Sequence, residues 1–137
     1  METIITTRTN VQIIEEGITQ FLKGNVNQVI EDCADDIVWH SYKVPGIPFT
    51  ETFRGKEGVQ EYFMQLAKNV RFTAFETREF ISQGDRVIVL GHTIADVIST
   101  GKSIDNEWCM SIRMQAGKLK EYFIFLDSYQ TYKAYQV

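Results

Sequence analysis

Hydrophobic residues in the first half of the chain recur at the three-to-four spacing that is typical of amphipathic helices. A first stripe stops before Gly24, a typical helix-ending residue, and predicts a first helix. Its members are Val11, Ile14, Ile18, Phe21 and Leu22. A shorter second helix is expected after a cap at Asn25 or Asn27, with Cys33 on its inner side. A stripe after Gly58 predicts a third helix and consists of Val59, Tyr62, Phe63, Leu66 and Ala67.

After this third helix the hydrophobic pattern changes to alternation, which is the period of a β-strand. Strands are expected at about 71–82, 86–98, 105–115 and 118–127. An earlier strand is expected at 37–42, whereas the segment 44–48 holds both prolines and predicts a loop or a sheet edge. Helices followed by consecutive strands are typical of an α+β fold. We therefore expect one domain, residues 1–137, with helices on one face of a curved, mostly antiparallel sheet.

Alternation within 105–115 separates the two faces of this sheet. Trp108, Met110, Ile112 and Met114 point the same way, so this side is expected to face the helices. The neighbouring strands contribute residues of the same parity to that side. They include Thr93 and Ala95 on one strand, and Tyr122, Ile124 and Leu126 on the other.

The opposite side of the sheet is also hydrophobic. By parity it carries Leu90 and His92 on one strand and Leu119, Phe123 and Phe125 on the last. Because helices cover only the other face, these side chains would leave an apolar patch, and such patches usually mark protein interfaces. We expect a homodimer through the outer sheet face around Leu90, His92, Phe123 and Phe125.

Composition and charge exclude several classes of protein. The chain has 137 residues, 44% of them hydrophobic, and a formal net charge of −4 with no basic cluster, which argues against a nucleic-acid partner. No stretch approaches the roughly 20 apolar residues of a membrane span. The first residues do not resemble a secretory signal, so a cytoplasmic protein without a membrane partner is expected.

The few residues that bind metals are far apart in the sequence. Cys33, His40, His92 and Cys109 lack the short spacings of metal sites, and two cysteines this distant fit reduced thiols. No phosphate-binding glycine loop and no nucleophile motif is present. We therefore expect neither a metal nor a cofactor.

Five segments, in this order and spacing, resemble the nuclear transport factor two-like superfamily, which includes SnoaL-like polyketide cyclases, ketosteroid isomerases and scytalone dehydratase. They lie at 21–25, 33–39, 53–59, 84–89 and 117–122 and span nearly the whole chain. The resemblance implies a cone-shaped, cystatin-like fold with about three N-terminal helices on the concave sheet face. It also implies a deep apolar pocket between helices and sheet, and homodimers are common in the superfamily.

The catalytic groups of these relatives do not transfer to this chain. The general base of the ketosteroid isomerases falls on Ser41, their protonated acid on Met110 and their oxyanion tyrosine near Gly17. The acid of the SnoaL-like cyclases falls on Ile124 and their histidine again on Met110. Each of these positions lacks the required polar group.

A pocket with apolar walls and a few hydroxyls is nevertheless expected, and it suits a small hydrophobic molecule. Its predicted lining is Trp39, Ser41, Phe63, Thr93, Ala95, Trp108, Met110, Tyr122 and Ile124. For Trp39 and Trp108, filling of the core is an equally open interpretation. Tyr122 is the best polar candidate, because a buried hydroxyl needs a partner and can hydrogen-bond a ligand carbonyl.

His40 and Asp127 are weaker catalytic candidates. Strand parity turns His40 away from the pocket unless a bulge reverses it, and Asp127 is expected to cap the C-terminal segment or to bond at the cone mouth. Two hypotheses stay open. One is a module that binds a small hydrophobic ligand without the catalytic acids of its relatives. The other is an isomerase, cyclase or dehydratase acting on a hydrophobic carbonyl or polycyclic compound.

Overall fold

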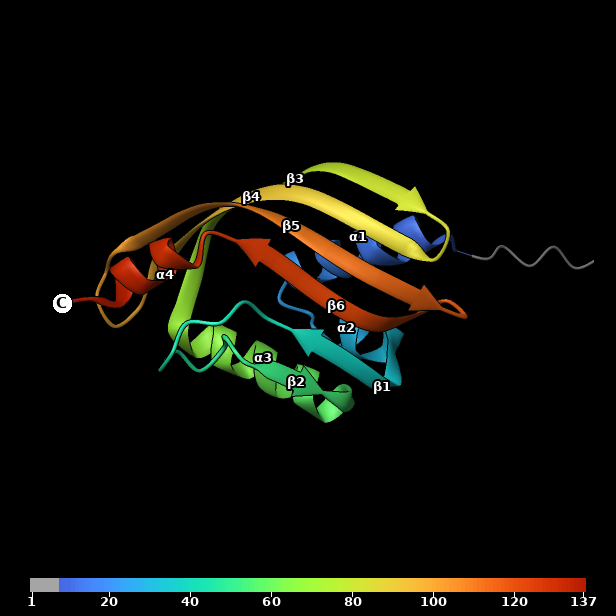
Figure 1. The fold of residues 1–137 in the computed structure, drawn as a ribbon, viewed down its shortest axis with the longest axis horizontal. Coiled ribbons are helices and arrows are strands. Elements are labelled where there is room, and N and C mark those ends of the chain that lie inside the picture. Colours follow the sequence, from blue (N-terminus) through green and yellow to red (C-terminus); the bar gives the residue numbers. More distant parts are fainter. Residues whose placement is uncertain (1–7) are drawn as a thin grey trace, which may run out of the picture.

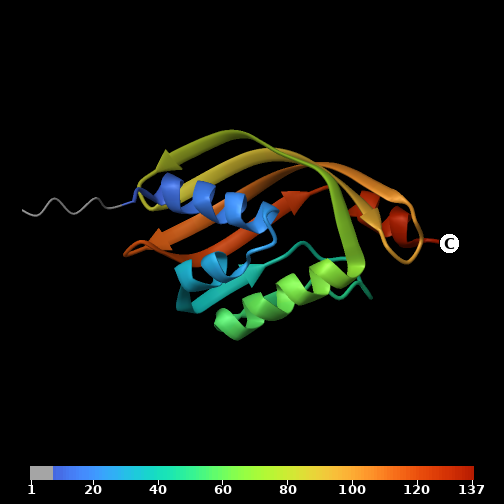
Figure 2. The ribbon, with the colours of Figure 1, turned by 180° about the vertical axis from the view of Figure 1, so that it is seen from behind.

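The computed structural model describes residues 8–137 (Figures 1 and 2). The helices are α1 (Asn10–Leu22), α2 (Asn27–Asp32), α3 (Gly55–Asn69) and α4 (Ser128–Tyr135). The strands are β1 (Cys33–His40), β2 (Thr52–Arg54), β3 (Val70–Gln83), β4 (Arg86–Val97), β5 (Ser103–Gln115) and β6 (Lys118–Leu126).

The strands form one six-stranded sheet in the order β2-β1-β6-β5-β4-β3. Only β1 and β6 pair in parallel, and all other neighbours are antiparallel. Figure 2 shows α1, α2 and α3 together on the concave side of the curved sheet, while α4 lies at one end. The α+β class, the curved and mostly antiparallel sheet and the three helices on one face are therefore confirmed.

The first helix carries the predicted stripe and ends just before Gly24, as predicted. Thr9 caps it through a hydrogen bond from the Gln12 amide, and the Gln12 side chain accepts a bond from the Thr9 amide. At its end Gly24 adopts a positive φ of 84°, and its amide bonds the carbonyl of Phe21. The amphipathic pattern and its terminal glycine thus fix the limits of α1.

The region after α1 differs from the sequence prediction. Neither Asn25 nor Asn27 caps α2, because Val26 occupies the cap and makes no side-chain bond, while the side-chain amide of Asn25 bonds Gln20. Cys33 is the first residue of β1 rather than part of the helix. The strand thus starts earlier than the predicted 37–42, since α2 continues directly into it.

The predicted orientation of Leu119 is wrong, and a bulge is the reason. Arg113 pairs with Glu121 but Met114 pairs with Leu119, so Lys120 is an extra residue in β6. The extra residue reverses the alternation of side chains before it. Leu119 is therefore buried on the inner face, opposite Met114, rather than on the outer face.

Gly91 allows an unusually close approach between strand and side chain. It lies opposite Trp108 in the pairing of β4 with β5. A Cβ atom built on Gly91 would lie 2.3 Å from Cζ2 of Trp108 and 2.6 Å from the backbone oxygen of Glu76. The missing side chain thus leaves room for the indole of Trp108 on the inner face.

Gly91→Ala should destabilise the protein by about 2 kcal/mol, because the added methyl group overlaps both the indole and a backbone oxygen. Gly17→Ala in α1 is the matched control. Its Cβ would lie 3.5 Å from Cγ2 of Val29, an ordinary contact, and alanine favours a helix interior by up to about 1 kcal/mol. Urea unfolding followed by circular dichroism measures both changes. A Gly91→Ala variant as stable as the wild type would contradict this account of Trp108.

Candidate functional site

A cavity of about 130 Å³ lies between the helices and the concave face of the sheet. Side chains of α1, α2 and α3 form one wall, and inward residues of β1, β4, β5 and β6 form the other. Of the residues predicted to line a pocket, all but Ser41 lie in this lining: Trp39, Phe63, Thr93, Ala95, Trp108, Met110, Tyr122 and Ile124. The volume is close to that of a cavity that holds one benzene ring.

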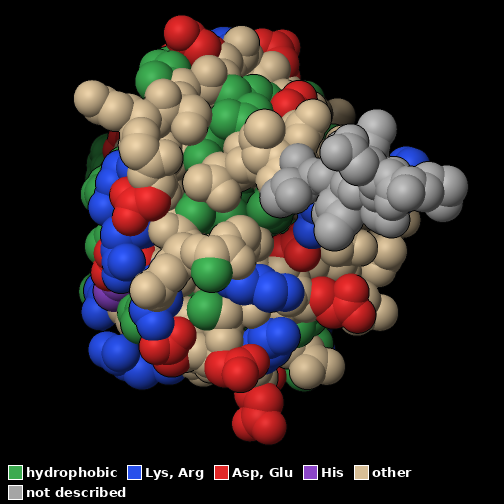
Figure 3. Space-filling model, turned by 90° about the vertical axis from the view of Figure 1, so that its right-hand side faces the viewer, with side chains coloured by type: hydrophobic (Ala, Val, Ile, Leu, Met, Phe, Trp, Pro, Cys, Tyr) green, Lys and Arg blue, Asp and Glu red, His purple; other side chains and the backbone are tan. Residues whose placement is uncertain are grey.

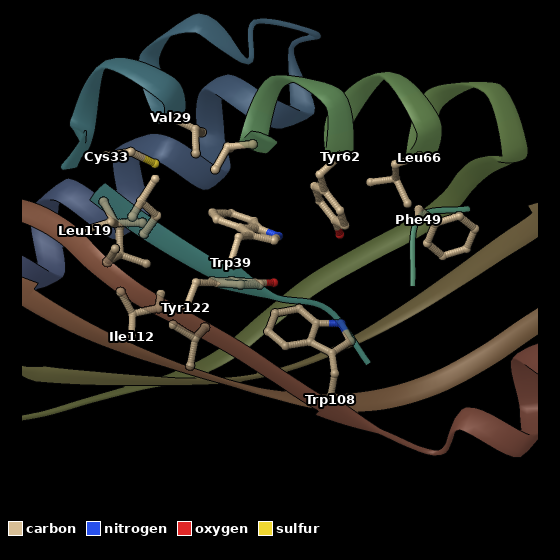
Figure 4. Close-up of a cluster of buried hydrophobic side chains, with 14 of the residues drawn as sticks. Val29, Cys33, Trp39, Phe49, Tyr62, Leu66, Trp108, Ile112, Leu119 and Tyr122 are labelled. Carbon is tan, nitrogen blue, oxygen red and sulfur yellow. The ribbon is translucent and has the colours of Figure 1, made fainter. Parts of the chain in front are cut away.

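The wall of the cavity is organised around one stacked pair of rings. Trp39 on β1 lies opposite Tyr122 on β6 in the parallel pairing. Their ring centroids are 3.7 Å apart and the planes differ by 16°. Figure 4 shows the two rings lying one above the other. Tyr62 and Phe63 of α3 pack against Trp39, with ring centroids 5.3 and 5.6 Å from the centroid of Trp39. Helix α3 therefore closes over the stacked pair.

Several N–H and O–H groups of this lining have no acceptor in the described chain. Nε1 of Trp39 is buried and makes no hydrogen bond. The hydroxyl of Tyr42 accepts a hydrogen bond from Thr131 at 3.1 Å. The hydroxyls of Tyr62 and Tyr122 donate to no acceptor among residues 8–137, and the indole N–H of Trp39 is directed at the Tyr62 hydroxyl. Figure 4 shows the nitrogen of Trp39 and the oxygens of Tyr62 and Tyr122 directed into the same space. The cavity thus presents a group of free donors.

Burial keeps these phenols protonated. It raises the pKa of Tyr42 to about 12 and the pKa of Tyr122 well above its ordinary value. Burial also raises the pKa of Tyr62, and the smaller, opposing effect comes from the indole N–H of Trp39, which is directed at the Tyr62 hydroxyl as a hydrogen-bond donor. At neutral pH the hydroxyls of Tyr62 and Tyr122 therefore act as hydrogen-bond donors.

Asp32 is the carboxylate of the lining, and the sequence did not single it out. Its Oδ1 accepts from Arg8 at 3.0 Å and its Oδ2 from Gln28 at 3.1 Å. Both oxygens are thus engaged, which leaves little capacity for proton exchange with a ligand. Its inward position follows from the direct continuation of α2 into β1, which no local pattern indicated.

Asn106 and Tyr62 also line the cavity and were missed. Asn106 shares its strand parity with Trp108, and Tyr62 belongs to the same helical stripe as Phe63, so both signals were present in the sequence. The Asn106 amide donates to the backbone oxygen of Asp127 at 3.4 Å. This hydrogen bond therefore joins β5 to the N-terminal end of α4.

The other predicted site residues lie outside the cavity. Ser41 is buried with an unpaired hydroxyl, but β1 ends at His40 and the Ser41 amide turns to bond the carbonyl of Glu51. His40 stacks on Phe123 of the outer face with centroids 4.2 Å apart, so the bulge that would turn it inward is absent at this position. Asp127 caps α4 by accepting from the amide of Tyr129 at 3.0 Å.

The described residues form no metal-binding cluster, and the buried thiol of Cys33 is a poor nucleophile. Between residues 8 and 137, no group of three or more His, Cys, Asp or Glu side chains is arranged to hold a metal ion. Cys33 is buried, which raises the pKa of its thiol to about 12 and makes it a poor nucleophile. None of the helices formed by these residues is long and apolar enough to cross a membrane.

Comparison with known proteins gives a family match and close structural likeness. The model of the SnoaL-like domain family matches residues 14–122. No curated protein matches the sequence. An NTF2-like protein from Burkholderia xenovorans is 24% identical over 96% of this chain and 98% of its own, with a TM-score of 0.85.

Two further solved structures share the fold. A protein of unknown function from Xanthomonas campestris, described as cystatin-like, is 18% identical over 93% of this chain and 96% of its own, with a TM-score of 0.77. TerC, co-crystallized with polyporic acid, is 22% identical over 91% of this chain and 96% of its own, with a TM-score of 0.78.

Proposed function

The chain belongs to the SnoaL-like domain family, and on this premise we propose that it binds a small, neutral ring compound in its cavity without acid–base catalysis. The observation that carries the proposal is the chemistry of the lining, which is aromatic and aliphatic with a few fixed polar groups. Such a lining is typical of small-molecule sites. The volume of about 130 Å³ selects a ligand of about one ring.

An enzyme of the isomerase, cyclase or dehydratase type is the alternative. It requires a proton donor or acceptor that reaches the ligand. In the described residues, no imidazole lines the cavity, and the carboxylate of Asp32 is held by Arg8 and Gln28. Two of the positions that carry catalytic groups in the resembling enzymes are occupied here by Met110 and Ile124, both of which line the cavity. Binding is therefore the better supported function.

TerC, a protein of the same fold, was co-crystallized with polyporic acid. This agrees with a role for such folds in holding organic molecules, and it supports the choice of ring compounds as first probes. The likeness at 22% identity concerns the fold alone, so the argument for binding rests on this chain's own lining.

Both tryptophans of the protein, Trp39 and Trp108, line the cavity, so all tryptophan emission reports on the site. Titration with toluene should give a saturable change of emission and a heat of binding with one site per chain. Ala95→Leu places three more carbons in the cavity and should weaken binding at least tenfold, because the ligand and the added atoms compete for one small volume.

The matched control is Ala67→Leu, the same change at an exposed position of α3, which should bind toluene like the wild type. Thermal unfolding checks that both variants fold. If neither toluene nor other single-ring compounds produce a saturable response in the wild type, the proposed function is wrong.

We also propose that the outer sheet face is covered by a second copy of this chain. Leu90, Cys109 and Phe125 lie opposite one another across β4, β5 and β6 and form one apolar row. The next row brings Phe123 beside His40. Phe125 is 59% exposed in the single chain. Hydrophobic area of this kind is stabilised by burial against a partner.

The charges on this face favour a copy of the same face over an oppositely charged protein. Arg78 bonds Glu76 and Glu107, both at 2.8 Å, and His92 lies 2.6 Å from Asp105. The charged groups are thus paired within the chain and require no counterion from the partner. Figure 3, a view from one end of the molecule, shows Lys and Arg side chains together with Asp and Glu side chains along its left edge.

Phe125→Asp should convert the protein to a monomer in sedimentation velocity at micromolar concentration, since it replaces the exposed ring of the apolar row by a charge. Ile98→Asp is the matched control. Ile98 is 57% exposed but lies beyond the end of β4, outside the face, so its variant should sediment like the wild type. A wild type that is strictly monomeric at this concentration would refute the homodimer.

A further inference from the structure

The cavity has more hydrogen-bond donors than its own residues use. Trp39 and Tyr122 are 4% and 3% exposed, and Tyr62 is also buried. Nε1 of Trp39 has no partner within hydrogen-bond distance, although it is directed at the hydroxyl of Tyr62. The hydroxyls of Tyr62 and Tyr122 donate to no acceptor among residues 8–137. Buried polar groups are nearly always paired, so an unpaired set that faces one space needs an explanation.

We propose that Trp39, Tyr62 and Tyr122 form a carbonyl-binding subsite, and that the ligand is a single-ring ketone whose oxygen accepts their hydrogen bonds. This inference rests on the proposed function, because it concerns the ligand of the same cavity. It adds the chemical class: a carbonyl group whose carbon is attached directly to a flat ring.

The geometry of the stacked pair brings the donors together. The Trp39 and Tyr122 rings are nearly parallel at 3.7 Å, so the nitrogen at the edge of one lies close to the hydroxyl at the edge of the other. The ring centroid of Tyr62, on α3, lies 5.3 Å from that of Trp39. Its hydroxyl points into the same space as the other two polar atoms. A carbonyl oxygen has two lone pairs and can accept from more than one of these groups.

The charges around the cavity favour a neutral ligand. No Lys, Arg or His of residues 8–137 lines it, and Arg8 is bonded to Asp32 and Glu16. An anion would lose its hydration without gaining a cation, which is strongly unfavourable. A ketone meets the donors without carrying a charge into the apolar wall, and its ring packs against the aromatic lining.

Acetophenone and α-methylstyrene provide the test, because they have the same shape and differ only in C=O against C=CH₂. Tyr122→Phe and Tyr62→Phe should each weaken acetophenone about fivefold, the effect of one neutral hydrogen bond, and leave α-methylstyrene unchanged or tighter. Tyr129→Phe is the matched control, since it removes an exposed hydroxyl outside the cavity and should change neither affinity. Calorimetry measures all affinities.

The ligand-free stability of the same variants provides a second readout. Removing an unpaired buried hydroxyl should leave the urea midpoint unchanged or raise it, whereas loss of a structural hydrogen bond would lower it. The inference is overturned if the Phe variants weaken both ligands equally, weaken neither, or lower the midpoint. If the wild type binds neither compound, the proposed function itself fails, so the two failures are distinguishable.

Discussion

The packing of Trp39 on Tyr122 is the contact on which the rest of the site depends. It exists because β1 and β6 pair in parallel and in a register that places these two residues opposite each other on the inner face. A slip of β1 by one residue would turn Trp39 to the outer face, away from Tyr122, and open the core. Helix α3 packs Tyr62 and Phe63 against the same pair, so sheet register and helix position determine one another.

This arrangement places hydrogen-bond donors in an otherwise apolar cavity. The aromatic rings supply the wall by their faces and hydrogen-bond donors by their edges, whereas the carboxylate of Asp32 is occupied by its neighbours. Met110 and Ile124 occupy inward strand positions in this lining, and neither side chain can donate or accept a proton. The lining therefore supports the proposed recognition of an acceptor atom.

Local patterns in the sequence were sufficient to predict the main helices and most residues of the inner sheet face. Alternation placed Thr93, Ala95, Trp108 and Met110 on the inner face, and helical stripes placed α1 and α3. They failed at Leu119, where the extra residue Lys120 reverses the alternation, and at Ser41, which lies just past the end of β1. The parallel pairing of β1 with β6 joins segments far apart in the chain, so no local pattern contained the stacked pair or the inward position of Asp32.

The infrared spectrum of acetophenone labelled with ¹³C at the carbonyl and bound to the protein tests the central claim most directly. Hydrogen bonds to the oxygen lower the C=O stretching frequency. The account predicts a band for the bound ketone well below its position in hexane, returning partly toward that position in Tyr122→Phe. A band at the hexane position in the wild type would show that the donors do not reach the ligand and would contradict the account.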